Sequence, residues 1–270
     1  MVCVHIDADD AEVYENVDPH DKKLKESFII AALTNALALL NETNIKAVVF
    51  VVGKNLVGNL QYQELLRRFI KEGHAIGNHS FSHAENFHSW GKDAQIQDIQ
   101  LADRIIRESL NCEPLHFRGP GYSSNHRIQS SLLNLGYLFD CTKIPLLYSS
   151  GLDLYFKVTK KSNKRIPSVL RAKDVFFAFT PPIVGIEEQL IHPNKFWGIP
   201  IYSTWIFRKK NPDQVFTKQI KSLEGPFLFH AIDFLDYSNE KSSIPALRIQ
   251  PDERFRIIRN ILFELKSRDF

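Results

Sequence analysis

Two histidines four residues apart, His79 and His83, are the side chains in this sequence best suited to binding a metal ion. They bound the segment His-Ser-Phe-Ser-His, and residues at i and i+4 share one face of a helical turn, so both imidazoles can reach one ion. Imidazole nitrogen suits zinc, cobalt, nickel or iron. The spacing also arises by chance in a chain with 10 histidines, so other ligands must accompany the pair to indicate a site.

Carboxylates near the N-terminus provide the candidate partners. Residues 2–7 read as a short buried strand that runs into Asp7-Ala8-Asp9-Asp10. Because side chains alternate along a strand, Asp7 and Asp9 point the same way. One carboxylate with two histidines makes a hydrolytic metal site, and a second carboxylate can accept a proton from water. Asp9 is the favoured ligand and Asp10 the alternative, although either could instead cap a helix or turn.

Two further segments end in residues with useful chemistry. Arg118 precedes the turn Gly119-Pro120-Gly121-Tyr122, where an arginine can bind a carboxylate with two hydrogen bonds, or lie on the surface. The apolar run 226–230 ends at His230, which could protonate a leaving amine or be a buried core residue.

The elements that position these residues alternate between strand and helix. Apolar, β-branched runs predict strands, and apolar residues at helical spacing predict helices. We expect strands at 2–7, 46–52, 115–118, 137–140, 174–180, 198–203 and 226–230, and helices at 22–42, 60–72, 93–111 and after Pro251. This alternation predicts an α/β fold, and the polar clusters follow strand ends, where (β/α) barrels carry their chemistry. We expect one domain over 1–270, with an irregular insertion around 150–197.

Composition excludes several classes of protein. The net charge of +3 is too small to indicate nucleic-acid binding, and the three cysteines lack the spacing of a disulfide framework. No signal peptide and no membrane-spanning run is visible, so we expect a protein that is cytoplasmic, either free or peripheral to the inner face of a membrane. The segment from Lys157 to Lys173 contains seven basic residues and no acidic residue. It is either a solvated loop or a site for an anionic carrier.

Taken in order, these pieces resemble the NodB-type polysaccharide deacetylases of carbohydrate esterase family 4, which share five ordered motifs. The resemblance implies a distorted (β/α)7 barrel. It implies that Asp7 is the catalytic base, that Asp9, His79 and His83 hold a divalent metal, most often zinc, and that Arg118 orients Asp7.

The later motifs of the family match the second half of the chain. Leu228-Phe229-His230 resembles the last motif, which makes His230 the general acid, and Asp140 after Gly136-Tyr137 resembles the fourth, which implies that Asp140 tunes His230. The resemblance also implies substrate contacts at Pro120, Gly121, Tyr122 and Leu228, with the Tyr122 amide binding the substrate oxygen.

The resemblance implies metal-dependent removal of an acetyl or formyl group from an amino sugar in a glycan or in a nucleotide- or lipid-linked precursor. The first motif departs from the commonest pattern of adjacent aspartates, and is closer to a branch that includes lipid-linked aminoarabinose deformylases. Cys141-Thr142 follows Asp140 where a tryptophan is usual. The alternatives are an allantoinase-like hydrolase of a small non-sugar amide and a glycan-binding relative without activity.

Overall fold

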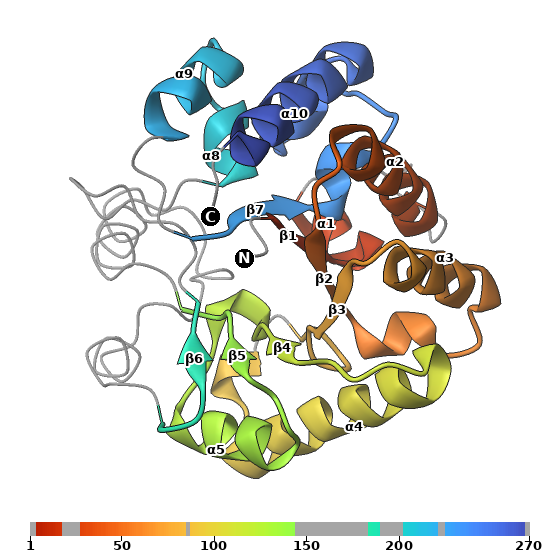
Figure 1. Cartoon of the computed structure of the whole chain (residues 1–270), viewed down its shortest axis with the longest axis vertical. Helices are drawn as coiled ribbons and strands as arrows, with labels where there is room; N and C mark the ends of the chain where they lie inside the picture. Colours follow the sequence, from red (N-terminus) through yellow and green to blue (C-terminus); the bar gives the residue numbers. More distant parts are fainter. Residues whose placement is uncertain are drawn as a thin grey trace.

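Seven parallel strands form the centre of the protein in a computed structural model, which describes residues 4–17, 28–84, 87–143, 183–189, 202–220 and 225–267. The strand order is β6-β5-β4-β3-β2-β1-β7. The strands are β1 (Val4–Ala8), β2 (Ala47–Val51), β3 (Ala75–Asn78), β4 (His116–Phe117), β5 (Phe139–Asp140), β6 (Glu187–Glu188) and β7 (Phe227–His230). The sheet curls into a half-barrel with helices outside it (Figure 1), which confirms the predicted distorted (β/α)7 barrel.

Helices connect the strands and cover the outer face of the sheet (Figure 1). They are α1 (Ala11–Val17), α2 (Phe28–Thr43), α3 (Leu60–Lys71), α4 (Lys92–Leu110), α5 (His126–Asn134), α8 (Ser203–Phe207), α9 (Pro212–Gln219) and α10 (Pro251–Lys266). Short 3₁₀ helices lie at Gly53–Leu56, Phe87–Ser89, Pro120–Tyr122, Ala231–Phe234 and Pro245–Arg248.

The two faces of β1 carry different kinds of side chain, apolar on one face and polar on the other. Val4, Ile6 and Ala8 are fully buried in the main apolar core. His5 and Asp7 alternate with them and so project to the opposite face, inside the curve of the sheet. The apolar face fixes the strand in the fold, and this fixes where the polar face presents its side chains.

The structure confirms most of the expected elements and corrects others. The strand that we expected at 198–203 is wrong at Ser203, because this residue begins α8. The strand that we expected at 174–180 lies outside the described residues. The sequence reading missed β3, whose Gly77 and Asn78 have low strand propensity. Gly77 is required there, since a Cβ would lie 2.6 Å from a ring carbon of Phe50.

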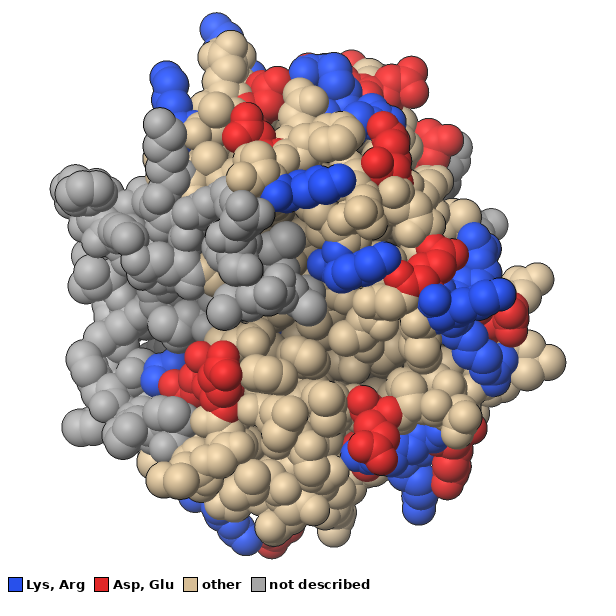
Figure 2. Space-filling model, viewed as in Figure 1, with Lys and Arg blue, Asp and Glu red and all other residues tan. Residues whose placement is uncertain are grey.

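The expected insertion around 150–197 is described only at 183–189, where β6 adds a short strand; the basic segment 157–173 lies outside the described residues. Within the described part of the chain, no helix is long and apolar enough to cross a membrane. On the described part of the face in Figure 2, acidic and basic side chains are interspersed. The described part of this face therefore presents no field of one sign.

Candidate metal and catalytic site

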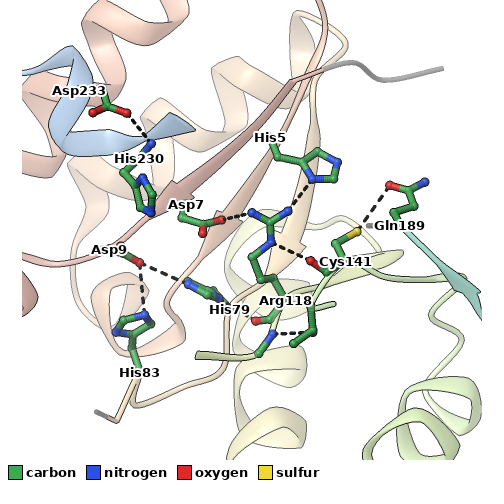
Figure 3. Close-up of polar contacts among 12 residues, drawn as sticks. His5, Asp7, Asp9, His79, His83, Arg118, Cys141, Gln189, His230 and Asp233 are labelled. Atoms are coloured by element: carbon green, nitrogen blue, oxygen red, sulfur yellow. Dashed lines mark hydrogen bonds and ion pairs between the residues drawn. The ribbon is translucent and has the colours of Figure 1, made fainter. Parts of the chain in front are cut away.

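Asp9, just beyond β1, lies against both histidines of the 79–83 segment. Its Oδ1 is 3.3 Å from His79 Nε2 and 3.2 Å from His83 Nε2. Figure 3 shows both imidazoles directed at this carboxylate. Among the described residues, these three are the group whose ligand atoms come within 4.8 Å of one another. The sequence reading thus named three residues that the fold brings together.

The 79–83 segment is a loop and not the helical turn that we expected. Ser80 and His83 have positive φ angles of 65° and 49°, which a right-handed helix does not allow. The carboxylate of Asp98 on α4 accepts hydrogen bonds from the backbone of Phe81 and Ser82. The loop therefore takes its shape from a side chain of another element, and its histidines converge without helical spacing.

Hydrogen bonds at the back of the site fix which nitrogen His79 presents. His79 Nδ1 lies 2.7 Å from the backbone oxygen of Arg118. A carbonyl only accepts, so Nδ1 carries the proton and Nε2 faces Asp9. The hydroxyl of Tyr14 donates to the other oxygen of Asp9, Oδ2, at 3.2 Å. Such outer contacts are typical of metal ligands, so this donor set fits a divalent ion.

The electrostatics of the cluster also favour a cation. Burial raises the pKa of Asp9, but the charges and hydrogen bonds of His83 and His79 outweigh it and hold that pKa well below its usual value. Burial lowers the pKa of His79, and its hydrogen bond to Asp9 reverses this and raises that pKa. The carboxylate is therefore ionised and attracts positive charge, whether protons or a metal ion.

Asp10 is placed away from this cluster. Its Oδ2 lies 2.7 Å from Lys54 Nζ, and the same amine is 3.0 Å from Glu12. A carboxylate paired with lysine is a weaker candidate for a metal ligand. The alternation argument that favoured Asp9 over Asp10 agrees with this placement.

Asp7 is held by Arg118 inside the half-barrel. Arg118 Nη1 donates to Asp7 Oδ1 at 2.9 Å, and both residues are almost fully buried. The guanidinium also donates to the Cys141 carbonyl at 3.1 Å and lies 4.4 Å from the centre of the Phe50 ring. An arginine fixed on three sides presents one charge to Asp7 in one geometry.

The turn after Arg118 is tightly closed. A Cβ at Gly119 would lie 1.9 Å from the oxygen of Ser123, so only glycine fits. The Gly119 amide donates to Thr142 Oγ1 at 2.9 Å. The Tyr122 amide, which we expected to face the substrate oxygen, donates instead to the Gly119 carbonyl at 3.0 Å. Gly121 is exposed and Pro120 is buried, and the predicted substrate contacts of this turn stay predictions.

Asp140 does not contact His230, contrary to our expectation. It is buried and accepts hydrogen bonds from Ser124 Oγ at 2.7 Å, Gln129 Nε2 at 3.1 Å and the Thr142 amide at 3.1 Å. Burial raises its pKa, although these hydrogen bonds oppose the shift. Asp140 thus fixes the chain from Asp140 to Thr142, which in turn binds the Arg118 turn.

His230 ends β7, the neighbour of β1. Asp7 and His230 are register partners, and Figure 3 shows the imidazole directed toward Asp7 and Asp9. The His230 amide donates to Asp233 Oδ2 at 2.8 Å, so Asp233 is the acid beside this histidine. Leu228 is fully buried, and its predicted substrate contact stays a prediction.

Three residues that support the site were absent from our sequence reading. They are His5, Tyr14 and Asp98. Asp98 left a detectable signal, since an acid beside Ile99 on the inward side of an amphipathic helix is unusual. His5 alternates with Asp7 on one strand and could have been noticed by the same periodicity that singled out Asp9.

Comparisons with known proteins show what this chain is similar to. A family model described as polysaccharide deacetylase matches residues 30–139. This stretch of the chain therefore resembles a polysaccharide deacetylase domain. Over 109 residues it is 31% identical to a chitin deacetylase from Pestalotiopsis sp, a match covering 40% of this chain and 36% of that protein. Over 101 residues it is 31% identical to a peptidoglycan-N-acetylglucosamine deacetylase from Bacillus cereus, covering 37% and 45%.

These matches span less than half the length of either curated relative. Solved structures extend the likeness of the domain's fold over nearly the whole chain. A putative polysaccharide deacetylase from Mycobacterium smegmatis has a TM-score of 0.56 at 14% identity, covering 96% of this chain and 82% of that one. A family 4 pseudoenzyme from Bacillus anthracis has a TM-score of 0.53 at 13% identity, covering 100% and 62%. The fold is therefore shared with a protein named as inactive, and activity must be argued from the site.

Proposed function

We propose that this protein hydrolyses the N-acyl group of an amino sugar with the help of a divalent metal held by Asp9, His79 and His83. One observation carries the proposal: Asp9 Oδ1 lies within 3.3 Å of both histidine Nε2 atoms, beside an aspartate that Arg118 holds. A metal bound there, for which the ligand set favours zinc, would polarise the amide carbonyl and make water more acidic.

Asp7 is suited to accept the proton of the attacking water. Arg118 occupies its Oδ1 and leaves Oδ2 for the proton. Asp7 is only 3% exposed, so little solvent competes for this oxygen. The reaction consumes one water and gives an amine and acetate or formate.

His230 is suited to deliver a proton to the departing nitrogen. It approaches the site from β7, on the side of β1 opposite to β2. The base that takes the proton from the attacking water and the acid that protonates the departing nitrogen therefore lie on neighbouring strands at one end of the sheet.

The substrate class is a further part of the proposal. The match to deacetylases of chitin and of peptidoglycan N-acetylglucosamine supports an N-acetylated sugar. The basic segment 157–173 supports an anionic carrier, such as a nucleotide- or lipid-linked precursor, used in the cytoplasm or at the inner face of a membrane. The first motif, Asp-Ala-Asp-Asp, supports the lipid-linked branch.

The test is release of acetate and formate from three substrates: free chitooligosaccharide, a nucleotide-linked N-acyl sugar and a lipid-linked N-acyl sugar. Activity should disappear with a chelator and return with zinc. Asp7→Asn should abolish turnover while elemental analysis still finds metal. No acid release from any N-acyl sugar, by protein that contains stoichiometric metal, would refute the proposal and favour a glycan-binding role.

A further inference from the structure

A histidine inside the half-barrel, His5, contacts the arginine that holds the base. Its side chain is fully buried on the inner face of β1, two residues before Asp7. Val48 and Leu228 are its register partners, and the Phe50 ring lies 5.1 Å away edge-on. An imidazole in such apolar surroundings is costly unless its nitrogens are hydrogen-bonded.

The protonation of His5 follows from its partner. Its Nδ1 lies 2.6 Å from Arg118 Nη2. A guanidinium only donates, so Nδ1 accepts and the proton is on Nε2. Burial, then the charges of Arg118 and His116, keep the pKa of His5 well below its usual value, so the ring stays a neutral acceptor.

The histidine is not explained by stability alone. Its Nε2 is buried and has no hydrogen-bond partner among the described residues, and an unpaired buried N–H destabilises a fold. Leucine would fill this position without that cost. The one hydrogen bond described for the ring is that to Arg118, so the reason for a histidine must be sought there.

The contact divides the two terminal nitrogens of the guanidinium between two acceptors. Nη1 binds Asp7 Oδ1 and Nη2 binds His5, while Nε binds the Cys141 carbonyl. Arginine and carboxylate otherwise tend to form two parallel hydrogen bonds that occupy both carboxylate oxygens. With Nη2 engaged by His5, Arg118 makes one hydrogen bond to Asp7, and no hydrogen bond to the second oxygen of Asp7 comes from the described residues.

We propose that His5 is a positioning residue that restricts Arg118 to a single hydrogen bond with Asp7, so that Asp7 Oδ2 remains available as the base. This inference rests on the proposed function for its catalytic consequence. The arrangement of Arg118 itself can be observed without any activity.

Three variants separate positioning from simple packing. His5→Leu keeps the volume and removes the acceptor. His5→Asn restores an acceptor, because the asparagine Oδ1 lies near the place of imidazole Nδ1. His116→Leu is the matched control: His116 is a buried histidine of β4 that stacks on Phe139 at 4.6 Å, and its Nδ1, like His5 Nε2, has no partner among the described residues.

The kinetic test measures kcat and KM for N-acyl sugar hydrolysis by the zinc-loaded full chain. Since a general base contributes roughly 100- to 10,000-fold, occupying Oδ2 should cost His5→Leu at least about tenfold in kcat, with KM nearly unchanged. His5→Asn should regain most of the rate, and His116→Leu should keep it. Unchanged kcat in His5→Leu, no recovery in His5→Asn, or an equal loss in His116→Leu would overturn the proposal.

Crystal structures of the wild type and of His5→Leu give a readout that needs no activity. Arg118 should make one hydrogen bond to Asp7 in the wild type and two in His5→Leu. A single bond retained in His5→Leu would overturn the positioning role even if the enzyme is active. A wild type that holds metal and releases no acid would instead refute the proposed function, and leave the change in Arg118 to be judged by the structures.

Discussion

The ion pair between Arg118 and Asp7 gives the sharpest test of the site's physical basis. Arg118 is 0% exposed and Asp7 is 3% exposed, so Arg118→Met leaves a buried carboxylate without its counter-charge. Breaking a buried pair from one side typically costs about 3–5 kcal/mol. The hydrogen bond to the Cys141 carbonyl is also lost, which leaves that acceptor unpaired. We expect Arg118→Met to lower the free energy of unfolding by about 4 kcal/mol, out of roughly 5–15 kcal/mol for a typical domain.

The double variant Asp7→Asn with Arg118→Met distinguishes charge from packing. It removes both charges, so its loss should be smaller than the sum of the two single losses by at least about 2 kcal/mol. Urea unfolding at pH 7, followed by circular dichroism in the presence of a chelator, measures all four proteins, with equal m-values as the check on two-state behaviour. A loss below about 1 kcal/mol in Arg118→Met, or additive single effects, would refute the reasoning.

Three further predictions concern the metal, acid stability and the C-terminal helix. Asp9→Asn should weaken zinc binding, measured by calorimetry, by more than the roughly 10- to 100-fold that is typical of losing an outer contact. Asp10→Asn should bind zinc like the wild type, and an equal loss of affinity in both variants would contradict the assignment of Asp9 as the ligand. Burial, and then the charge of Arg118, lower the pKa of His116 in the folded protein to about 4. On acidification this histidine is therefore protonated in the unfolded chain before it is protonated in the folded protein, so the free energy of unfolding falls from about pH 6.5 downward. The wild type should lose up to roughly 3 kcal/mol more than His116→Leu between pH 6.5 and 4, at about 1.4 kcal/mol per pH unit, and parallel stability curves would exclude this role. Arg254→Met should lower the free energy of unfolding, measured in urea, by about 3–5 kcal/mol. The reason is that fully buried Arg254 donates hydrogen bonds to five backbone carbonyls, those of Asp233, Leu235, Tyr237, Ala246 and Ile249. A loss below about 1 kcal/mol would show that water or other donors replace the arginine.

Much of the fold could be predicted because its strands carry their own signal. Residues 47–52 form an unbroken apolar run rich in β-branched valine, as expected of a strand covered on both faces. The positions of Asp7, Asp9 and His230 then follow from strand alternation and strand ends. β3 lacked this signal, because its Gly77 leaves room for the Phe50 ring of the neighbouring strand β2 and has itself a low strand propensity. A local sequence pattern does not report such a need.

The conformation of the site loops was less predictable for the same reason. His83 adopts a positive φ because Asp98, Ser80 and neighbouring backbone groups bind the loop, and sequence spacing alone suggested a helical turn. Asp140 matched a motif in order, yet its side-chain partners Ser124 and Gln129 come from the preceding loop and helix. Contacts between elements distant in sequence decided both cases.

The strand order has a consequence for how the site is assembled during synthesis. β1, which carries Asp7, lies between β2 and β7. During translation β2 is made soon after β1, whereas β7 is made near the end of the chain, so β1 can pair with β2 long before it pairs with β7. Asp9, His79, His83 and Arg118 all emerge well before His230. If the chain acts as proposed above, its metal ligands are therefore all made before His230, the proposed proton donor. The order of the strands would let metal loading precede the moment at which the protein becomes competent to cleave a substrate.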